Sequence, residues 1–362
     1  MADPVDWGLA EKVAVRVAGR EPLAASYHYD RLTADFDELT AQAEALVERA
    51  TGLRSASGPA RARVVDRSDW VRANLASFGR LLRPLTERMA ERLDERRGPS
   101  AALGGFSRRA AGVEVGALLG WMATRVLGQY DLLIVEDEDP QDQDLVYYVG
   151  PNVLAIEKRY GFPPREFRLW LALHEVTHRA QFTGVPWLRG HFLSLVNQTL
   201  DAVDPDPKRF FDAAARVIDD LRSGHNPLDE GGIATLLASP DQRQLFGRIG
   251  GMMSLLEGHG DVTMDRAGEG HVPSAARFSR ALRERRRQGG SAAKVLQKAM
   301  GIDAKMKQYA QGESFIAYVE RHGGPDSLDA AWRGPEWLPT LAEIRAPQEW
   351  LDRVRLSEEL VG

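Results

Sequence analysis

The most informative stretch of this sequence is Phe167-Arg-Leu-Trp-Leu-Ala-Leu-His-Glu-Val-Thr-His-Arg-Ala-Gln-Phe182. Pro163-Pro164 stands just before it, and prolines are tolerated in the first turn of a helix. The apolar residues of the stretch recur until Gly184 and Pro186, two residues that end helices. The pattern therefore predicts one long helix, which begins near Pro164 and continues to about Phe182.

Within that predicted helix, His174, Glu175 and His178 form the pattern His-Glu-x-x-His. Two histidines four residues apart lie one above the other on a helical face, so both imidazoles can reach one ion at about 2 Å. Glu175 directly follows the first histidine and can take a proton from a water whose pKa the metal lowers. The alternative is a pair of ordinary, partly buried histidines. Because the chain has no cysteine, any metal must be held by His, Asp or Glu.

A catalytic zinc site needs a third protein ligand and one open position. The best donor is Glu257, on a long helix that we expect to start at Ser239-Pro240. Asp261 follows one turn later on the same face and can accept a hydrogen bond from a liganding imidazole. The rival ligand is His259, which points about 200° away from Glu257 around the helix. Further candidates are His191, Asp265 and His271.

The neighbours of Glu257 are apolar residues and glycines. The apolar residues argue against the alternative of a surface glutamate, and a buried carboxylate needs a cation or a donor. Each glycine costs a helix roughly 1 kcal/mol relative to alanine. We therefore expect two helices to approach closely here. The apolar residues are Met252, Met253, Leu255 and Leu256, and the glycines are Gly250, Gly251, Gly258 and Gly260.

Metal-assisted attack on an amide also benefits from a donor that stabilises the oxyanion. Lys305, Tyr309 and Gly312 share a helical face at spacings of four and three residues. We take Tyr309 as the candidate catalytic donor. A solvated lysine and a half-buried tyrosine are the alternative, and His271 is no better supported.

Most of the chain has the three- and four-residue apolar spacing of amphipathic helices. Residues 30–97 show it, residues 114–127 read as a further helix with a nearly continuous apolar surface, and the chain after Pro186 reads as helical nearly to its end. We expect an α+β fold that is predominantly α-helical, with a small antiparallel sheet. It would comprise an N-terminal helical region, 1–129, and a metal-binding region, 130–362, in one compact unit. The predicted strands are Asp131–Val135, Leu145–Val149 and Asn152–Glu157.

Composition excludes several classes of partner. The net charge of −5 lacks the basic excess of a nucleic-acid-binding protein, and the basic segment Arg277–Arg287 is short and without interleaved aromatics. No stretch approaches the roughly 20 apolar residues of a membrane helix. The first residues, Met1–Trp7, do not resemble a secretory signal. We expect a cytoplasmic protein that binds neither nucleic acid nor a membrane.

The order of these motifs resembles the gluzincin branch of zincin metallopeptidases. In that branch a second helix supplies a Glu ligand, and an Asp one turn later supports a ligand histidine; Glu257 and Asp261 match these positions. The active helix, with Pro186–Arg189, Leu256–His259 and Asp303–Tyr309, looks like a zincin-like metallopeptidase family found mainly in actinobacteria. Some of its members are labelled as associated with coenzyme F420 biosynthesis. The resemblance covers about residues 30–354 and implies a zincin-like core with helical additions.

These features predict a zinc-dependent hydrolase, a metallopeptidase with one zinc ion per chain and a peptide or peptide-like substrate. In zincins, an edge strand before the active helix pairs with an extended substrate. By that analogy, Leu145–Val149 or Val153–Glu157 would face the substrate. The alternative is a non-catalytic binding or regulatory protein whose metal site is covered by the helical additions.

Overall fold

The structure is a computed structural model that describes residues 5–21, 23, 26–95, 101–132, 144–201, 240–287 and 302–361. Within these ranges, the side chains of residues 84, 85, 88–95, 101–107, 286, 287, 302–310 and 361 are not described. The chain divides into two compact units. Unit 1 comprises residues 1–184 and 267–278, and unit 2 comprises residues 185–266 and 279–362. Among the helices of the described ranges, none has the length and apolar character needed to span a membrane.

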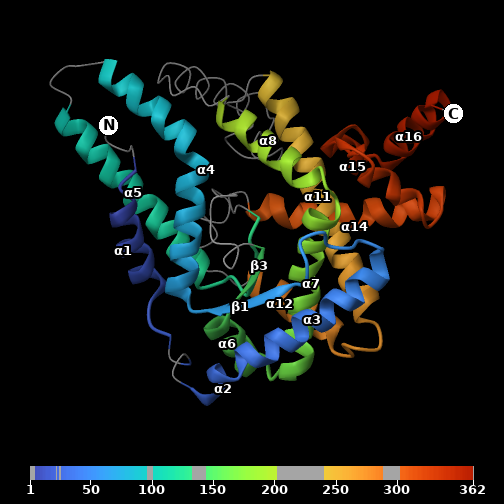
Figure 1. Cartoon of the computed structure of the whole chain (residues 1–362), viewed down its shortest axis with the longest axis horizontal. Coiled ribbons are helices and arrows are strands. Elements are labelled where there is room, and N and C mark those ends of the chain that lie inside the picture. The colour runs from blue at the N-terminus through green and yellow to red at the C-terminus, as the bar shows by residue number, and fades with distance from the viewer. Residues whose placement is uncertain are drawn as a thin grey trace. The chain divides into compact units, whose positions relative to one another are not determined.

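Unit 1 combines helices with one small sheet (Figure 1). Its elements are α1 (Trp7–Ala18), α2 (Tyr27–Asp30), α3 (Leu32–Thr51), β1 (Arg61–Val65), α4 (Arg67–Glu95), α5 (Ala101–Ala123), β2 (Gly128–Tyr130), β3 (Leu145–Val149), α6 (Gly150–Tyr160) and α7 (Pro164–Gly184). The remaining elements are helical: α8 (Leu188–Asp201), α11 (Pro240–Gly268), α12 (Ala275–Arg287), α14 (Ile302–Gly323), η2 (Ser327–Trp332), η3 (Pro335–Trp337), α15 (Leu341–Arg345) and α16 (Pro347–Val361). The predicted, predominantly helical α+β class is confirmed. Helices α7 and α11 begin where the prolines predicted them.

The sheet has the strand order β1-β3-β2 and is mixed, whereas the sequence predicted an antiparallel sheet. β2 runs antiparallel to β3, with Gln129 opposite Tyr147. β1 runs parallel to β3, with Arg63 also opposite Tyr147. Sequence analysis missed β1 because Arg-Ala-Arg-Val-Val is short and lies between two helical patterns.

Two predicted strands differ from the structure. Asn152–Glu157 is wrong, because these residues lie in helix α6. Pro151 occupies its first turn, and Gly161 ends it in the left-handed conformation, donating its N–H to the Glu157 carbonyl. In Asp131–Val135, residues 131 and 132 are not in a strand, and 133–135 lie outside the described residues.

β3 is the central strand, and all five of its side chains are buried. The Tyr148 ring stacks on Phe36 of α3 with 3.8 Å between centroids, and its hydroxyl lies 2.8 Å from the Thr40 Oγ1. Because β3 is paired on both sides, it has no free edge for a substrate. The analogy that assigned this role to Leu145–Val149 or Val153–Glu157 is therefore wrong for both segments.

Arg168, which is buried, anchors the first half of α7. Its guanidinium donates from Nε and Nη2 to the two carboxylate oxygens of Glu157 at 2.7 and 2.8 Å. It also pairs with Asp35 of α3. Two carboxylates from two other helices thus fix the position of α7, and the cation compensates their desolvation.

In unit 2, α11 and α14 are in backbone contact at Gly258 and Gly312. A Cβ on Gly258 would lie 2.4 Å from the Gly312 carbonyl carbon, and one on Gly312 would lie 2.0 Å from the Ser254 oxygen. Gly251 is equally constrained, since its Cβ would be 2.1 Å from the Pro339 oxygen. These contacts confirm the close approach that the glycines around Glu257 predicted.

Candidate metal centre

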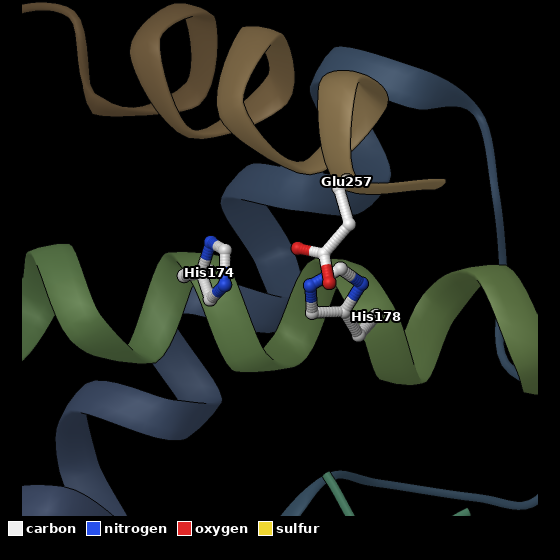
Figure 2. Close-up of side chains that lie close together, drawn as sticks. All are labelled: His174, His178 and Glu257. Atoms are coloured by element: carbon white, nitrogen blue, oxygen red, sulfur yellow. The ribbon is translucent and has the colours of Figure 1, made fainter. Parts of the chain in front are cut away.

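The three predicted metal ligands, His174, His178 and Glu257, lie close together (Figure 2). Each offers one ligand atom, and these atoms all lie within 4.8 Å of one another. Figure 2 shows the Glu257 carboxylate, which comes from α11, directed towards the two imidazoles on α7. Two nitrogens and one carboxylate oxygen form a donor set that zinc prefers, and three protein ligands leave a fourth position for water or substrate. The residues therefore fit a catalytic zinc ion.

Helix α7 presents the two histidines on one face. They are four residues apart, and their ring centroids are 4.7 Å apart with the planes nearly perpendicular. Within the fully described stretch Phe167–Phe182, every residue is buried except these two histidines, which are partly exposed. Burial of the rest of the helix therefore orients both imidazoles to the same partly open face.

Gln181, which sequence analysis missed, is a hydrogen-bonding partner of His178. Its Oε1 lies 3.0 Å from His178 Nδ1, and the Gln181 side chain is completely buried. Because an amide oxygen can only accept, Nδ1 carries the proton and Nε2 keeps its lone pair for a metal. Such a partner fixes both tautomer and ring orientation. Its signal in the sequence was the spacing His-x-x-Gln on the buried side of the helix.

Glu175 is 6% exposed and packs against strand β2. Its Oε2 accepts a hydrogen bond of 3.1 Å from the Tyr130 backbone N–H. A Cβ on Gly128 would lie 2.7 Å from both Cγ and Oε1 of Glu175, so only glycine leaves room for this carboxylate. Sequence analysis missed both β2 residues. The glycine was the available signal, since glycine inside a strand often marks a close approach.

Two other candidates on α11, His259 and Asp261, are not members of this group. His259 is buried and contacts the Trp332 ring edge-to-face, with 5.1 Å between centroids. It is not part of the three-residue group. Asp261 is partly buried one turn after Glu257. Its hydrogen bond to a liganding imidazole stays a prediction.

The remaining alternative ligands are likewise not in the group. His191 lines a cavity of about 840 Å³ in unit 2, where burial and the nearby Arg248 lower its pKa. Burial, with Glu313 nearby, raises the pKa of Asp265. His271 is exposed in the turn after α11.

The predicted oxyanion donor is not tested. Lys305 and Tyr309 lie on α14, but their side chains are outside the described part of the chain. Gly312 packs against α11, which explains its presence as a contact between helices. The role of Tyr309 stays a prediction.

Comparisons with known proteins extend these observations to the whole chain. A family model described as zincin-like metallopeptidase matches residues 5–351. A crystal structure from Chloroflexus aurantiacus, described as "a putative hydrolase with a novel fold", is 30% identical and has a TM-score of 0.70. The match covers 97% of this chain and 99% of that one. No curated protein matches.

The resemblance to zincin-like metallopeptidases is thus confirmed at the level of the family. Its narrower parts, the actinobacterial distribution and the link to coenzyme F420, stay predictions. The family model covers nearly the whole chain, including the motif helix and the helix that carries Glu257. The chain therefore belongs to the zincin-like metallopeptidase family.

Proposed function

We propose that this protein is a zinc-dependent hydrolase that cleaves peptide or amide bonds. His174, His178 and Glu257 are the proposed zinc ligands, and Glu175 is the proposed general base. The observation that carries this proposal is the convergence of three ligand atoms within 4.8 Å beside a glutamate whose carboxylate is held by a backbone N–H. Family membership supports a hydrolase in general.

Each residue has a distinct role in the proposed reaction. Zinc, when bound, supplies a Lewis acid and lowers the pKa of a coordinated water. Gln181 keeps His178 in the tautomer that leaves Nε2 available. Glu175 takes a proton on its carboxylate and then delivers it to the departing amine. Burial of Glu175 keeps bulk water away from this proton transfer.

We assign the substrate-facing edge to β2. Hydrogen bonds from Val149 N–H to the Leu127 carbonyl and from Asp131 N–H to the Leu145 carbonyl join this segment to β3. In an antiparallel pair, alternate residues point their backbone groups the other way, so those of Gly128 and Tyr130 face away from β3. This is the edge at which Tyr130 meets Glu175. An extended substrate that lies along this edge, where Glu175 already accepts the Tyr130 N–H, would be beside the general base.

The decisive experiment replaces Glu175 with Gln and measures both metal content and cleavage. A survey of peptides, with and without chelator, identifies the substrate to be used. We expect Glu175→Gln to retain one zinc ion and to lose on the order of 100-fold or more in turnover. Glu166→Gln is the matched control, because it lies on α7 and its amide oxygen can still accept from the Ser274 N–H. Full activity of Glu175→Gln would overturn the assignment of the base.

The burial of Glu175 favours a second candidate, a metal-containing binding or regulatory protein with a covered site. In that protein Glu175→Gln changes neither zinc content nor any measurable reaction. Stoichiometric zinc, together with no cleavage of any peptide, would support this candidate over the hydrolase.

A further inference from the structure

Asp144 has a backbone conformation that residues other than glycine rarely adopt. Its φ is 54°, the only positive value outside glycine among the described residues. Asp tolerates this region better than most residues, but the conformation is still costly and persists where the surroundings enforce it. Asp144 immediately precedes the central strand β3. Its carboxylate has two partners, Arg179 and Tyr130, which account for its orientation.

Arg179 is 1% exposed and directly follows His178 on α7. Its guanidinium donates from Nε to Asp144 Oδ1 at 3.1 Å and from Nη2 to Oδ2 at 2.5 Å. It also donates to Glu44 of α3 at 2.6 Å and to the Gly58 carbonyl at 2.7 Å. Planar, multiply hydrogen-bonded arginine pairs of this kind restrict geometry strongly. The Asp144 carboxylate is thus held in a fixed position relative to the helix that carries the histidines.

Tyr130 connects this partly buried ion cluster to Glu175. Its hydroxyl donates to Asp144 Oδ1 at 3.1 Å, and its backbone N–H donates to Glu175 Oε2 at 3.1 Å. The ring packs beside Phe182 of α7, with 6.4 Å between centroids. A strand of three residues at the edge of a small sheet has few hydrogen bonds of its own. The side chain of Tyr130 adds a further constraint to this short strand.

We propose that Tyr130 is a positioning residue for Glu175, and that its hydroxyl, anchored by Asp144 and Arg179, holds the outer edge of β2 at a fixed distance from the Glu175 carboxylate. This inference rests on the proposed function, in which Glu175 is the base. The cluster then sets the position of the base and of the substrate-facing edge together. Tyr130 does so without touching the metal.

Single-residue amide hydrogen exchange tests the proposal without any substrate. The Tyr130 N–H faces away from β3 and donates to Glu175, so losing this hydrogen bond should make the N–H exchange faster. We expect Tyr130→Phe, which removes only the hydroxyl, to accelerate exchange at residue 130 by at least about 10-fold, reflecting more frequent local opening. Glu175→Ala should produce the same acceleration and serves as the positive control. Tyr318→Phe, which removes a tyrosine hydrogen bond to Gln348, should leave residue 130 unchanged.

Kinetics provide the second readout. Tyr130→Phe should lower kcat/KM about 10-fold while zinc content stays at the wild-type value, because the base and the substrate-facing edge are displaced and the ligands are not. Asp144→Asn tests the same link from its other side, since Asn also tolerates a positive φ. Wild-type exchange at residue 130 in both variants would overturn the proposal. A wild-type protein that cleaves nothing would contradict the proposed function, yet the exchange measurement would still decide whether Tyr130 positions Glu175.

Discussion

Gln181 is not proposed as a metal ligand, yet it determines whether His178 can bind a metal. His178 can offer Nε2 to a metal only if the proton stays on Nδ1, and the buried Gln181 oxygen provides the acceptor for that proton. We expect Gln181→Leu to weaken zinc affinity about 10- to 100-fold, the usual cost of losing such a partner. Competition with a chelator of known affinity measures this change.

Gln181→Glu is the matched variant for this prediction. It keeps an acceptor oxygen at the same position, so zinc affinity should stay close to that of the wild-type protein. Equal affinity in Gln181→Leu and the wild-type protein would show that the orientation of His178 does not depend on this hydrogen bond.

Variants of Glu257 and His259 test which of the two residues is the third zinc ligand. Glu257→Gln should reduce zinc affinity by more than Gln181→Leu does, because it replaces a charged ligand. His259→Phe should leave zinc content unchanged, since phenylalanine preserves the aromatic contact with Trp332. Metal analysis of both purified variants checks this. Loss of zinc from His259→Phe would contradict our ligand assignment.

At the scale of elements, glycines determine where two helices can cross with their backbones in contact. Gly258→Ala on α11 would place its Cβ 2.4 Å from the backbone of Gly312 on α14, so the helices must separate. We expect a loss of unfolding free energy of about 1–3 kcal/mol, the usual cost of overpacking. Urea denaturation measures it.

Gly247→Ala on the same helix is the control. Nothing lies within 4 Å of a Cβ at Gly247, so alanine should stabilise α11 by about 0.5–1 kcal/mol through its higher helix propensity. If both substitutions changed the free energy of unfolding in the same direction, helix propensity rather than the crossing with α14 would explain these glycines.

The ion pairs of α7 give a second prediction at this scale. Arg168→Met removes the cation between Glu157 and Asp35 and should cost about 3–5 kcal/mol of unfolding free energy. Arg165→Met, three residues earlier, breaks an exposed pair with Glu38 and should have little effect. Denaturation at two salt concentrations distinguishes the two sites, because salt screens the exposed pair much more than the largely buried one.

At the scale of the whole molecule, a bound metal should stabilise the fold. A zinc ion that binds the native chain and not the unfolded one adds about 2.7 kcal/mol at a free concentration of 100 times Kd. We expect the chelator-treated protein to gain Tm when zinc is added, and to gain none from magnesium, which prefers oxygen ligands. The Glu257→Gln variant should show a smaller zinc-dependent shift in calorimetry. An identical shift in that variant would remove Glu257 from the site.

Local signals in the chain were sufficient for much of this architecture. The prolines before α7 and α11 predicted where both helices begin, and the four-residue spacing of His174 and His178 placed two imidazoles on one face. Glycines near Glu257 predicted a close crossing. Each of these inferences depends on residues within a few turns of one another, where helical periodicity is a dependable guide.

Only the folded chain decided the rest, because those features depend on partners far apart in sequence. β1 is a strand because it pairs with β3, more than eighty residues later. Asn152–Glu157 has the composition of a strand, yet α6 forms there. The position of the Glu175 carboxylate depends on Gly128 and Tyr130 of β2. Tyr130 lies forty-five residues before Glu175 along the chain. Short apolar runs fit either a strand or a buried helix, and the neighbours that choose between them are assembled only by long-range packing.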